Sequence, residues 1–279
     1  MSTEIKNTSY THQTYQAHAS FVPLLTSKIT SLLSPTPTDR IVDLGAGDLI
    51  LTSKLSLHCQ HILALDASTD LITSGQSLFP RTEYPNLDSR VVDCRYLEKE
   101  DDVTTGNWDK VFSNAALHWI LRDPSTRTNT LKATYDALKP GGKFIAETGG
   151  FGNISEVHTA VTSALRNRGI PLSTIREANP WFFPSVQHMR TLLEGTGFEV
   201  EMIESEHRPT ELSVEDGEGE GGVKAWIEMF GQRFLELVPE EERGKVAGEA
   251  RDLLEGVARR EDGRWVVGYV RLRWVAVKK

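Results

Sequence analysis

The stretch best suited to chemistry is RIVDLGAGDLILT, residues 40–52, in which an acidic residue and two glycines follow an apolar run. Asp43 lies near the end of that run, and Gly45 and Gly47 come directly after it. Glycine permits positive φ and a close approach of ligand to backbone, and a helix that begins there offers free N–H groups. This combination commonly binds nucleotides. Two glycines also occur in any tight strand-to-helix turn, so the residues that follow must decide between a ligand-binding turn and an ordinary one.

Acidic residues end the next two apolar runs. Asp66 ends HILALD at roughly the distance from the glycine turn, about 20 residues, where nucleotide-binding α/β units place a carboxylate for ribose hydroxyls. Its alternative role is to cap the next helix, but Asp70 is the better cap. We therefore interpret Asp66 as a ligand-binding residue. Asp93 ends SRVVD, where it can bond an adenine amino group or serve only as a turn former.

A third group lies in WDKVFSNAALHWI, residues 108–120, where Asn114, His118 and Trp119 crowd a strand-to-helix junction. Ligands bind beyond the carboxyl ends of the strands in parallel sheets. We interpret His118 as a site residue and as the candidate catalytic base, because a neutral imidazole can take a proton near neutral pH. Trp119 fits core packing as well as it fits ligand contact.

The elements that must position these residues alternate between strand and helix. The patterns predict strands at 41–44, 61–66, 89–93, 108–114 and 143–148, with helices between them. A further helix begins at Asp123-Pro124, a cap followed by a first-turn proline, and it ends at the KPGG of residues 139–142. This order predicts an α/β fold with a doubly wound, mostly parallel sheet and helices on both faces.

The second half of the chain is less regular. We predict helices at 153–168 and 185–195, strands at 198–203 and 265–277 with the last one antiparallel, and a charged helix at 240–260. The apolar side of that helix is predicted to carry Val246, Ala250, Leu253, Leu254 and Val257. The acidic, glycine-rich stretch at 212–222 is predicted to be a surface hinge.

Two aromatic stretches in this half leave alternatives open. NPWFFP places Trp181, Phe182 and Phe183 between two prolines, which makes it either a plug on the core or the wall of a ligand pocket. The helical stripe that includes Trp226 and Phe230 is either core or a lid. If these aromatic residues face the pocket, the acceptor is at least partly apolar.

Composition narrows the class of protein. The chain has 279 residues, 39% hydrophobic and 25% charged, which fits one large globular domain or a domain with a cap. The polar start and the lack of an apolar run of about 20 residues predict neither a signal peptide nor a membrane partner. Cys59 and Cys94 fall in predicted core, so we expect no disulfide and a reducing, cytoplasmic location. A net charge of −8 argues against nucleic acid as partner, and no Cys/His spacing predicts a metal.

Several stretches together resemble the class I S-adenosylmethionine-dependent methyltransferases. They are VDLGAGD (42–48), ALDAS (64–68), VVDCRYL (91–97), FSNAALHWI (112–120) and LKPGGKFIAE (138–147). The resemblance is closest to the trans-aconitate 2-methyltransferase group. In the second half it continues through GNI (152–154), NPWFFP (179–184), LLEGTGFEVE (192–201) and DGRWVVGYVRLRWVA (262–276).

The resemblance covers most of the chain and implies its organisation. It implies a Rossmann-like sheet of seven strands with an antiparallel terminal strand and a helical cap. Residues 1–39 would form an arm and helix over the cofactor site, residues 40–150 the cofactor-binding core, and residues 151–279 the cap with the last strands. The cofactor would be S-adenosylmethionine, with S-adenosylhomocysteine as product, and we expect a small-molecule acceptor and a monomer.

The resemblance also implies residue roles. Around the cofactor it places Asp43, Gly45, Ala46 and Gly47 on the methionine side, Asp66 and Ala67 at the ribose and adenine, Asp93 and Cys94 at the adenine, Asn114 and Ala115 near the sulfonium, and Tyr15 and Phe21 in a covering segment. The predicted acceptor pocket consists of His18, His118, Trp119, Trp181, Phe182, Phe183, Trp226 and Phe230.

One residue departs from the family pattern. Leu49 stands where such enzymes usually have a third glycine. We expect its side chain to point into the sheet–helix interface; the alternative is a narrowed cofactor site. Leu49 also keeps open a second hypothesis, a methyltransferase-like protein without transfer activity that serves as a binding module or a non-methylating catalyst. A nicotinamide-dependent dehydrogenase is a third, weakened by the missing glycine of the dinucleotide fingerprint.

Overall fold

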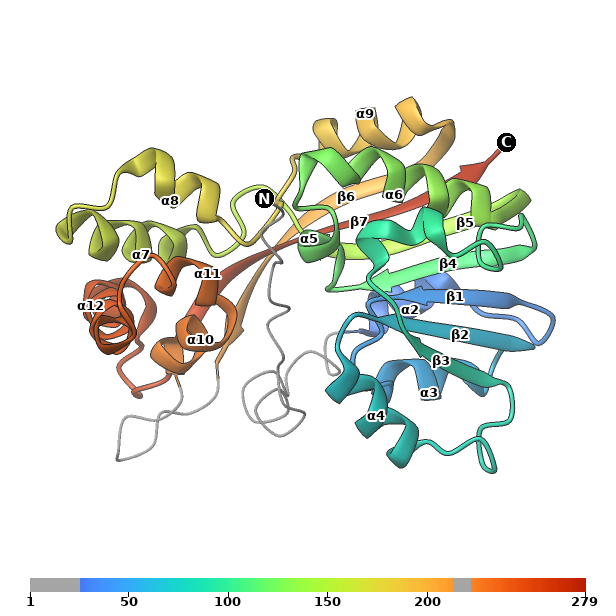
Figure 1. Cartoon of the computed structure of the whole chain (residues 1–279), viewed down its shortest axis with the longest axis horizontal. Helices are drawn as coiled ribbons and strands as arrows, with labels where there is room; N and C mark the ends of the chain where they lie inside the picture. Colours follow the sequence, from blue (N-terminus) through green and yellow to red (C-terminus); the bar gives the residue numbers. More distant parts are fainter. Residues whose placement is uncertain (1–25, 213–221) are drawn as a thin grey trace.

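A seven-stranded sheet in the order β3-β2-β1-β4-β5-β7-β6 forms the centre of the computed structural model, which describes residues 26–212 and 222–279 (Figure 1). The strands are β1 (Arg40–Leu44), β2 (His61–Asp66), β3 (Leu87–Val91), β4 (Trp108–Asn114), β5 (Leu138–Gly149), β6 (Phe198–Glu211) and β7 (Val266–Lys278). Strands β1 to β5 pair in parallel, and β7 is antiparallel to both β5 and β6. The predicted doubly wound sheet with an antiparallel terminal strand is confirmed.

Helices cover both faces of the sheet and form a separate lobe beside it (Figure 1). Those around the sheet are α2 (Ser27–Leu33), α3 (Ile50–Ser56), α4 (Thr69–Leu78), the 3-10 helix η2 (Cys94–Lys99), α5 (Leu117–Ile120), α6 (Pro124–Ala137) and α9 (Val186–Thr196). Those of the lobe are α7 (Ser155–Asn167), α8 (Leu172–Ala178), α10 (Gly222–Phe230), α11 (Gln232–Leu235) and α12 (Glu240–Ala258). Helix α8 was not predicted.

Local sequence explains where these helices begin. Asp123 caps α6 as predicted, since its Oδ1 accepts the Ser125 N–H at 2.8 Å. The cap of α4 is Ser68, whose Oγ accepts the Leu71 N–H at 3.3 Å, and the prediction of Asp70 is wrong. A cap needs extended backbone, which Ser68 has, whereas Asp70 already lies inside the first turn.

Three apolar clusters among the described residues make up the core. One lies on the sheet face covered by α5, α6 and α9, and a second lies on the opposite face with α2, α3 and α4. Alternate residues of one strand supply the two clusters, as a sheet buried on both faces requires: Ile41 belongs to the second and Val42 to the first. Cys59 and Cys94 are buried free thiols, as predicted.

The third cluster fills the lobe and is attached to the sheet by its longest strands. It joins α7, α8, α10, α11 and α12 to Val267 and Tyr269 of β7. Strands β6 and β7 extend from the sheet into this lobe (Figure 1). The prediction that β6 ends at residue 203 is wrong, because β6 pairs with β7 as far as Glu211. The second half of β6 is rich in charged residues, so the sequence pattern did not indicate a strand there.

The buried side of α12 also differs from the predicted one. Leu253 and Val257 are 51% and 76% exposed, whereas Ala247, Ala250 and Leu254 are buried against the lobe. Helix α12 packs closely on α7, and small alanines allow that approach. Val246, Ala250 and Leu254 of the predicted side are buried as predicted, and the prediction is wrong for Leu253 and Val257 because it gave weight to large apolar residues.

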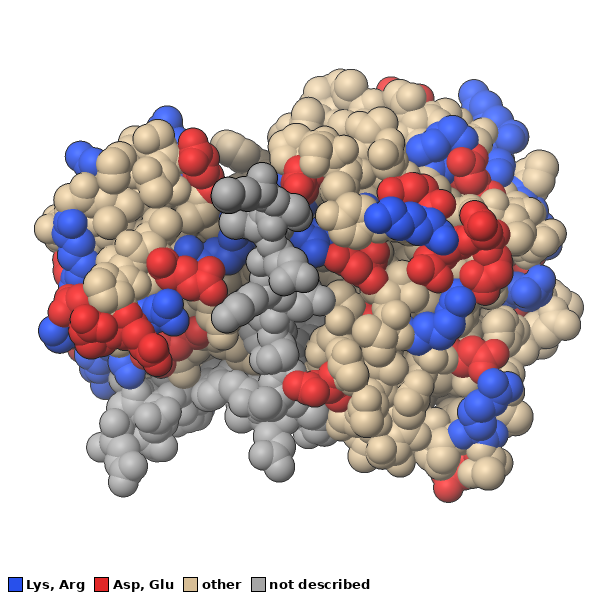
Figure 2. Space-filling model, in the orientation of Figure 1, with Lys and Arg blue, Asp and Glu red and all other residues tan. Residues whose placement is uncertain are grey.

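The described surface carries mixed charge. On the face drawn in Figure 2, basic and acidic side chains intermingle rather than separate. Within residues 26–212 and 222–279, no helix combines the length and apolarity needed to cross a membrane. The same residues contain no group of three or more His, Cys, Asp or Glu side chains arranged to hold a metal ion.

Candidate functional site

The turn after β1 is built on left-handed backbone. Gly45 has φ 75° and Gly47 has φ 61°, and the N–H groups of Gly45 and Ala46 both donate to the Leu65 carbonyl at the end of β2. A Cβ on Gly45 would lie 2.2 Å from the Ala116 Cβ, so this position must be glycine. A Cβ on Gly47 would meet no atom of the described part of the chain within 4 Å. The backbone at Gly47 therefore borders open space that a ligand can fill.

Leu49 occupies a third left-handed position, with φ 64°, directly before α3. Its side chain is fully buried in the cluster with α2, α3 and α4. There it lies against Gly75 of α4, whose missing Cβ would be 2.5 Å from the Leu49 Cγ. The expectation that Leu49 points into the sheet–helix interface is confirmed, and the turn is not narrowed by this side chain.

Asp66 connects the end of β2 to the glycine turn. Its Oδ2 accepts the Gly47 N–H at 2.9 Å and its Oδ1 accepts the Ser68 N–H at 2.8 Å. Burial raises the pKa of Asp66 above its ordinary value, and these backbone donors partly oppose the rise. A carboxylate has about four acceptor positions, and the Gly47, Ser68 and Ala67 N–H groups use three of them, so Asp66 can still accept a ligand hydroxyl.

Asp43 has a structural partner on the neighbouring helix. Its Oδ2 accepts the Thr52 hydroxyl at 2.7 Å, which ties β1 to α3. Burial raises the pKa of Asp43 to about 7, the Thr52 hydrogen bond lowers it, and the nearby Asp66 charge raises it further. A cationic group bound at the turn would stabilise the ionised form of Asp43.

Asp93 and Cys94 begin η2. Both carboxylate oxygens of Asp93 accept hydrogen bonds from Arg95. Oδ1 accepts from the Arg95 backbone N–H at 3.1 Å and from the Arg95 Nε at 2.9 Å, and Oδ2 accepts from the Arg95 Nη2 at 2.5 Å. Asp93 is thus the cap of η2, the turn-forming alternative, and its contact with adenine remains a prediction. Cys94 is buried, and burial raises the pKa of its thiol, which keeps it neutral.

Asn114 and Ala115 follow at the end of β4. The Oδ1 atom of Asn114 is buried and has no hydrogen-bond partner among the described residues. Ala115 has φ 57°, and its N–H donates to the Glu147 carbonyl at 2.8 Å. A buried acceptor without a donor is costly, so Asn114 presents a position that a ligand N–H or O–H would satisfy.

Most of the predicted pocket aromatics form one cluster, which we call the aromatic cluster. Its ring centroids are linked by distances of 5.3 Å (His118–Trp119), 5.8 Å (His118–Phe183), 6.0 Å (Trp119–Trp181) and 5.0 Å (Trp226–Phe230). Trp181 joins both halves through Phe183 and Trp226, with centroids at 5.7 Å and 5.9 Å. The cluster bridges α5, the segment 179–184 and α10.

Phe182 does not belong to this cluster. Its ring lies under the Arg127 guanidinium at 3.6 Å and beside His188 at 5.9 Å. Neighbouring residues of an extended segment point to opposite sides, so Phe183 and Phe182 separate. The predicted residues Tyr15, His18 and Phe21 lie outside the described residues.

His118 is held as a neutral imidazole. Its Nδ1 is 3.1 Å from the Thr148 hydroxyl. Removal from water lowers the pKa of His118 to about 3, and the Arg271 charge contributes to the shift. Such a group is a poor base near neutral pH, and the role of His118 as catalytic base remains a prediction.

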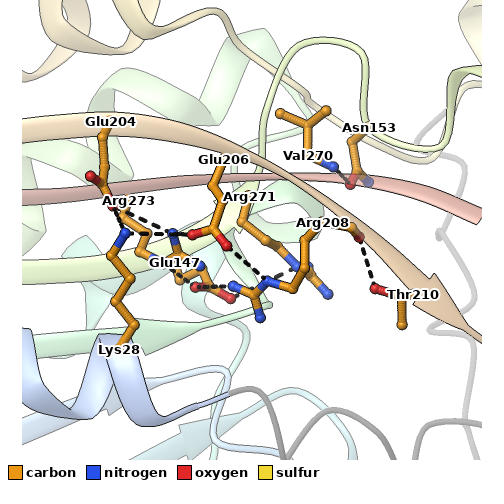
Figure 3. A network of polar contacts seen from close by, with 10 residues as sticks. All are labelled: Lys28, Glu147, Asn153, Glu204, Glu206, Arg208, Thr210, Val270, Arg271 and Arg273. Atoms are coloured by element: carbon orange, nitrogen blue, oxygen red, sulfur yellow. Dashed lines mark hydrogen bonds and ion pairs between the residues drawn. The ribbon is translucent and has the colours of Figure 1, made fainter.

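Sequence reasoning missed a set of charged residues at the sheet end, which we call the arginine network (Figure 3). Glu147 of β5 binds the guanidinium of Arg273, and its Oε2 accepts from the Arg208 Nη2 at 3.3 Å. Arg273 also donates to Glu206 at 2.6 Å. The signal was present, because Arg271 and Arg273 alternate with apolar residues in a predicted strand and therefore share one face.

Comparison with known proteins identifies the class of enzyme. The family model of a methyltransferase domain matches residues 42–144. The chain is 36% identical over 265 residues to the Schizosaccharomyces pombe protein named "Uncharacterized methyltransferase C70.08c", a match that covers 95% of this chain and 96% of that protein. The chain therefore belongs to the class I S-adenosylmethionine-dependent methyltransferases, and its cofactor is S-adenosylmethionine.

Solved structures share the fold. The YcgJ protein of Bacillus subtilis superposes with a TM-score of 0.61 at 14% identity, covering 94% of this chain and 99% of that one. Phosphoethanolamine N-methyltransferase 2 of Haemonchus contortus, which was crystallised with S-adenosylhomocysteine and phosphomonomethylethanolamine, superposes with a TM-score of 0.55 at 15% identity, covering 95% of this chain and 57% of that one.

The residues at the sheet end fit this cofactor. S-Adenosylmethionine carries two ribose hydroxyls and an ammonium group, all of them donors. The turn offers open space at Gly47, the Asp66 carboxylate keeps acceptor positions, and the buried Asn114 Oδ1 has no donor. The hydrogen-bond donors of the ligand therefore match the acceptors that the site presents.

Proposed function

We propose that this enzyme transfers a methyl group from S-adenosylmethionine to a small-molecule acceptor that binds beside the aromatic cluster. The observation that carries this proposal is that a polar surface at the strand ends lies next to the apolar surface of the aromatic cluster. The polar ends of β1, β2 and β4 border the aromatic cluster, because Asn114 and His118 belong to one β4–α5 connection. One surface suits the cofactor and the other suits an apolar part of an acceptor.

We propose the following roles for the cofactor residues. The turn of Asp43, Gly45, Ala46 and Gly47 holds the methionine part, and Asp66 with Ala67 holds the ribose and the edge of the adenine. Asp93 and Cys94 lie at the adenine, and Asn114 with Ala115 lies near the reacting sulfur. The unsatisfied Oδ1 of Asn114 supports the last assignment. Tyr15 and Phe21 would cover the bound cofactor from the N-terminal segment.

The acceptor chemistry follows from the bases available. Bound S-adenosylmethionine supplies a methyl group on a positively charged sulfur, which is a good leaving group. The chain itself needs to align the acceptor and exclude water. Because the pKa of His118 is lowered to about 3, we infer an acceptor that needs no strong base, such as a carboxylate, thiolate or amine. Acceptors of this kind are compatible with the implied trans-aconitate 2-methyltransferase group.

We propose the same division of labour along the chain that the resemblance implies. Residues 1–39 cover the cofactor site, residues 40–150 bind the cofactor, and residues 151–279 supply the cap and the last strands. The packing of α10 and segment 179–184 in the aromatic cluster supports an acceptor-binding role for the cap. The net charge of −8 and the intermingled surface charges support an acceptor other than nucleic acid. A monomer in the cytoplasm remains our expectation.

Calorimetric titration with S-adenosylmethionine and S-adenosylhomocysteine tests the proposed site. We expect micromolar binding, on the order of −8 kcal/mol. Asp66→Asn should weaken both ligands about tenfold or more, because it replaces a carboxylate acceptor by an amide. Asp70→Asn is the matched control, an exposed aspartate on the adjacent helix, and should bind as the wild type does. Equal affinities for the two variants would overturn the placement of the ribose at Asp66.

A screen with labelled S-adenosylmethionine then identifies the acceptor class. Small carboxylates, thiols, amines and phenols of matched size are offered at equal concentration. Methylation of a carboxylate, thiol or amine would support the proposal. Methylation of phenols alone would require a base and would contradict the role inferred from His118.

A further inference from the structure

The arginine network lies next to the reacting edge of the sheet. Residues directly paired across strands form a row that runs from Asn114 of β4 to Glu147 of β5 and then to Arg273 of β7. The next pair on the same face, toward the carboxyl end of β5, is Gly149 with Arg271. Arg271 therefore stands one step beyond Glu147, on the side where β1, β2 and β4 end at the proposed cofactor site.

Arg271 is held differently from its neighbours. Arg273, with no exposed surface, donates to Glu147 and to Glu206. Arg271 is only 4% exposed, yet its nearest carboxylate oxygen, Glu147 Oε1, is 3.8 Å from its Nε, which has no hydrogen-bond partner. Its guanidinium carbon lies 4.5 Å from the centroid of the Tyr269 ring. The Arg271 side chain is thus positioned by packing and left without a hydrogen-bonded anion.

The charges of the described network do not balance. Its cations are Lys28, Arg208, Arg271 and Arg273, and its anions are Glu147, Glu204 and Glu206. Glu204 and Glu206 contact Lys28 and Arg273, and Glu206, the direct cross-strand partner of Arg271, also lies 3.7 Å from the Arg208 Nε (Figure 3). Within the described residues, Glu206 lies within 4 Å of Lys28, Arg208 and Arg273, whereas Arg271 has Glu147 alone within that distance. A desolvated cation is costly unless an anion accompanies it.

Arg271 also adjoins the aromatic cluster. A Cβ on Gly149, its partner across the strands, would lie 2.4 Å from the Phe183 ring. Side chains of directly paired residues point to the same face of a sheet, so Phe183 and Arg271 share a face. The Arg271 charge also lowers the pKa of His118, another member of the cluster. The Arg271 guanidinium and the Phe183 ring therefore lie on one face of the sheet, beside the pair of Gly149 and Arg271.

We propose that Arg271 is a specificity-determining residue that binds an anionic group, carboxylate or phosphate, on the acceptor. This proposal rests on the proposed function and deepens it. The acceptor is amphipathic: its apolar part lies on the aromatic cluster, and its anion receives hydrogen bonds from the Arg271 guanidinium. Arg271 supplies a fixed, planar set of donors suited to such an anion.

Binding of simple probes to the protein saturated with S-adenosylhomocysteine tests this proposal. The probes are phenylacetate, phenyl phosphate and the uncharged phenylacetamide, measured by calorimetry. We expect at least one anion to bind and phenylacetamide to bind about tenfold or more weakly. Arg271→Gln should weaken the anion about tenfold or more, and Arg271→Lys should weaken it less because the charge is kept. The better of the two anions tells a carboxylate site from a phosphate site.

Lys28→Gln is the matched control, since it removes one positive charge from the other, exposed end of the same network. It should bind the probes as the wild type does. Titration with S-adenosylhomocysteine and the melting temperature of each variant report the cofactor site and the fold separately. If the wild type fails to bind S-adenosylhomocysteine, the proposed function fails. If cofactor binding is intact but no anion binds, or if both Arg271 variants bind the anion unchanged, the role of Arg271 is overturned.

Discussion

At the scale of single residues, the site depends on side chains whose ionisation is set by burial. Asp43 and His118 are shifted in the directions that favour their neutral forms, to about 7 and about 3 respectively. Both shifts arise mainly from the loss of water around the group. At neutral pH the imidazole is therefore uncharged, while Asp43 can respond to a cationic ligand.

His118 makes a prediction about pH and stability. Its pKa is lowered from 6.5 to about 3 in the folded protein. The unfolded state therefore binds more protons between these values, and the stability present above pH 6.5 is lost as the pH falls. At about pH 4.5 we expect wild type to have lost roughly 3 kcal/mol through this residue, and His118→Gln to have lost none of that part. Urea unfolding of both proteins at several pH values measures the difference.

The pH dependence of kcat in wild type and His118→Gln shows whether His118 acts as a base or only lines the site as a neutral residue. Above about pH 6 the pH dependence of kcat should have the same shape in wild type and His118→Gln, because the imidazole does not titrate there. An acidic limb, a fall of kcat as the pH falls toward 6, that is present in the wild type and missing from the variant would restore the role of catalytic base.

At the scale of elements, the departure from the family's glycine pattern is compensated by a second glycine. Leu49 adopts a left-handed conformation, which costs a non-glycine residue about 1 to 2 kcal/mol. Its side chain regains stability by filling the space beside Gly75 of α4. The turn and α4 therefore act as a pair, and Leu49 is a packing residue that leaves the ligand side of the turn open.

Substitution of Gly75 tests this pair. Gly75→Ala should destabilise the protein by about 1 to 3 kcal/mol, since the new Cβ would lie 2.5 Å from the Leu49 Cγ and 2.8 Å from the Asp48 carbonyl oxygen. Adding Leu49→Ala should relieve the first contact only, so the double variant should be more stable than the sum of the single effects predicts.

Gly256→Ala is the control for the Gly75 substitution. Gly256 also lies in a helix, α12, but its Cβ would meet nothing within 4 Å. It should stabilise by about 0.5 to 1 kcal/mol. Strict additivity of the Leu49 and Gly75 changes in urea unfolding would rule out the pairing.

At the scale of the whole molecule, β6 and β7 make the sheet and the cap one structure. Tyr269 belongs to the cluster of the cap, whereas Leu272 and Trp274 of the same strand belong to the cluster under α6 and α9. The arginine network lies between these two parts and joins α2, β5, β6 and β7 (Figure 3). We therefore expect the acceptor side and the cofactor side to be held in a fixed relation.

Glu147→Gln tests how much the arginine network contributes to the free energy of unfolding. Arg273 is fully buried and Glu147 is 3% exposed, so removing the carboxylate leaves buried guanidinium groups without their main anion. We expect a loss of about 3 to 5 kcal/mol in the free energy of unfolding. Glu201→Gln, which breaks an exposed pair with Lys143 on the same sheet, should change it by less than about 1 kcal/mol. Similar losses in the two variants would mean that the network does not hold the sheet and cap together.

Local sequence by itself determined the α/β core and the positions of its glycine turn and strand-end acids. Apolar runs of four to six residues, separated by caps and turns, define β1, β2, β4 and β5 whatever lies around them. Gly45, Gly47, Asp66 and Asn114 could be found because their places at strand ends follow from that order.

Tertiary structure alone decided which residues meet. The second half of β6 reads as a polar loop and becomes a strand only because β7 pairs with it. The small residues of α12 are buried because α7 approaches closely, and Phe182 leaves the aromatic cluster because its neighbour enters it. The partners of Glu147, Arg271 and His118 are far apart in sequence, and their charges depend on burial and on contacts that no local pattern contains.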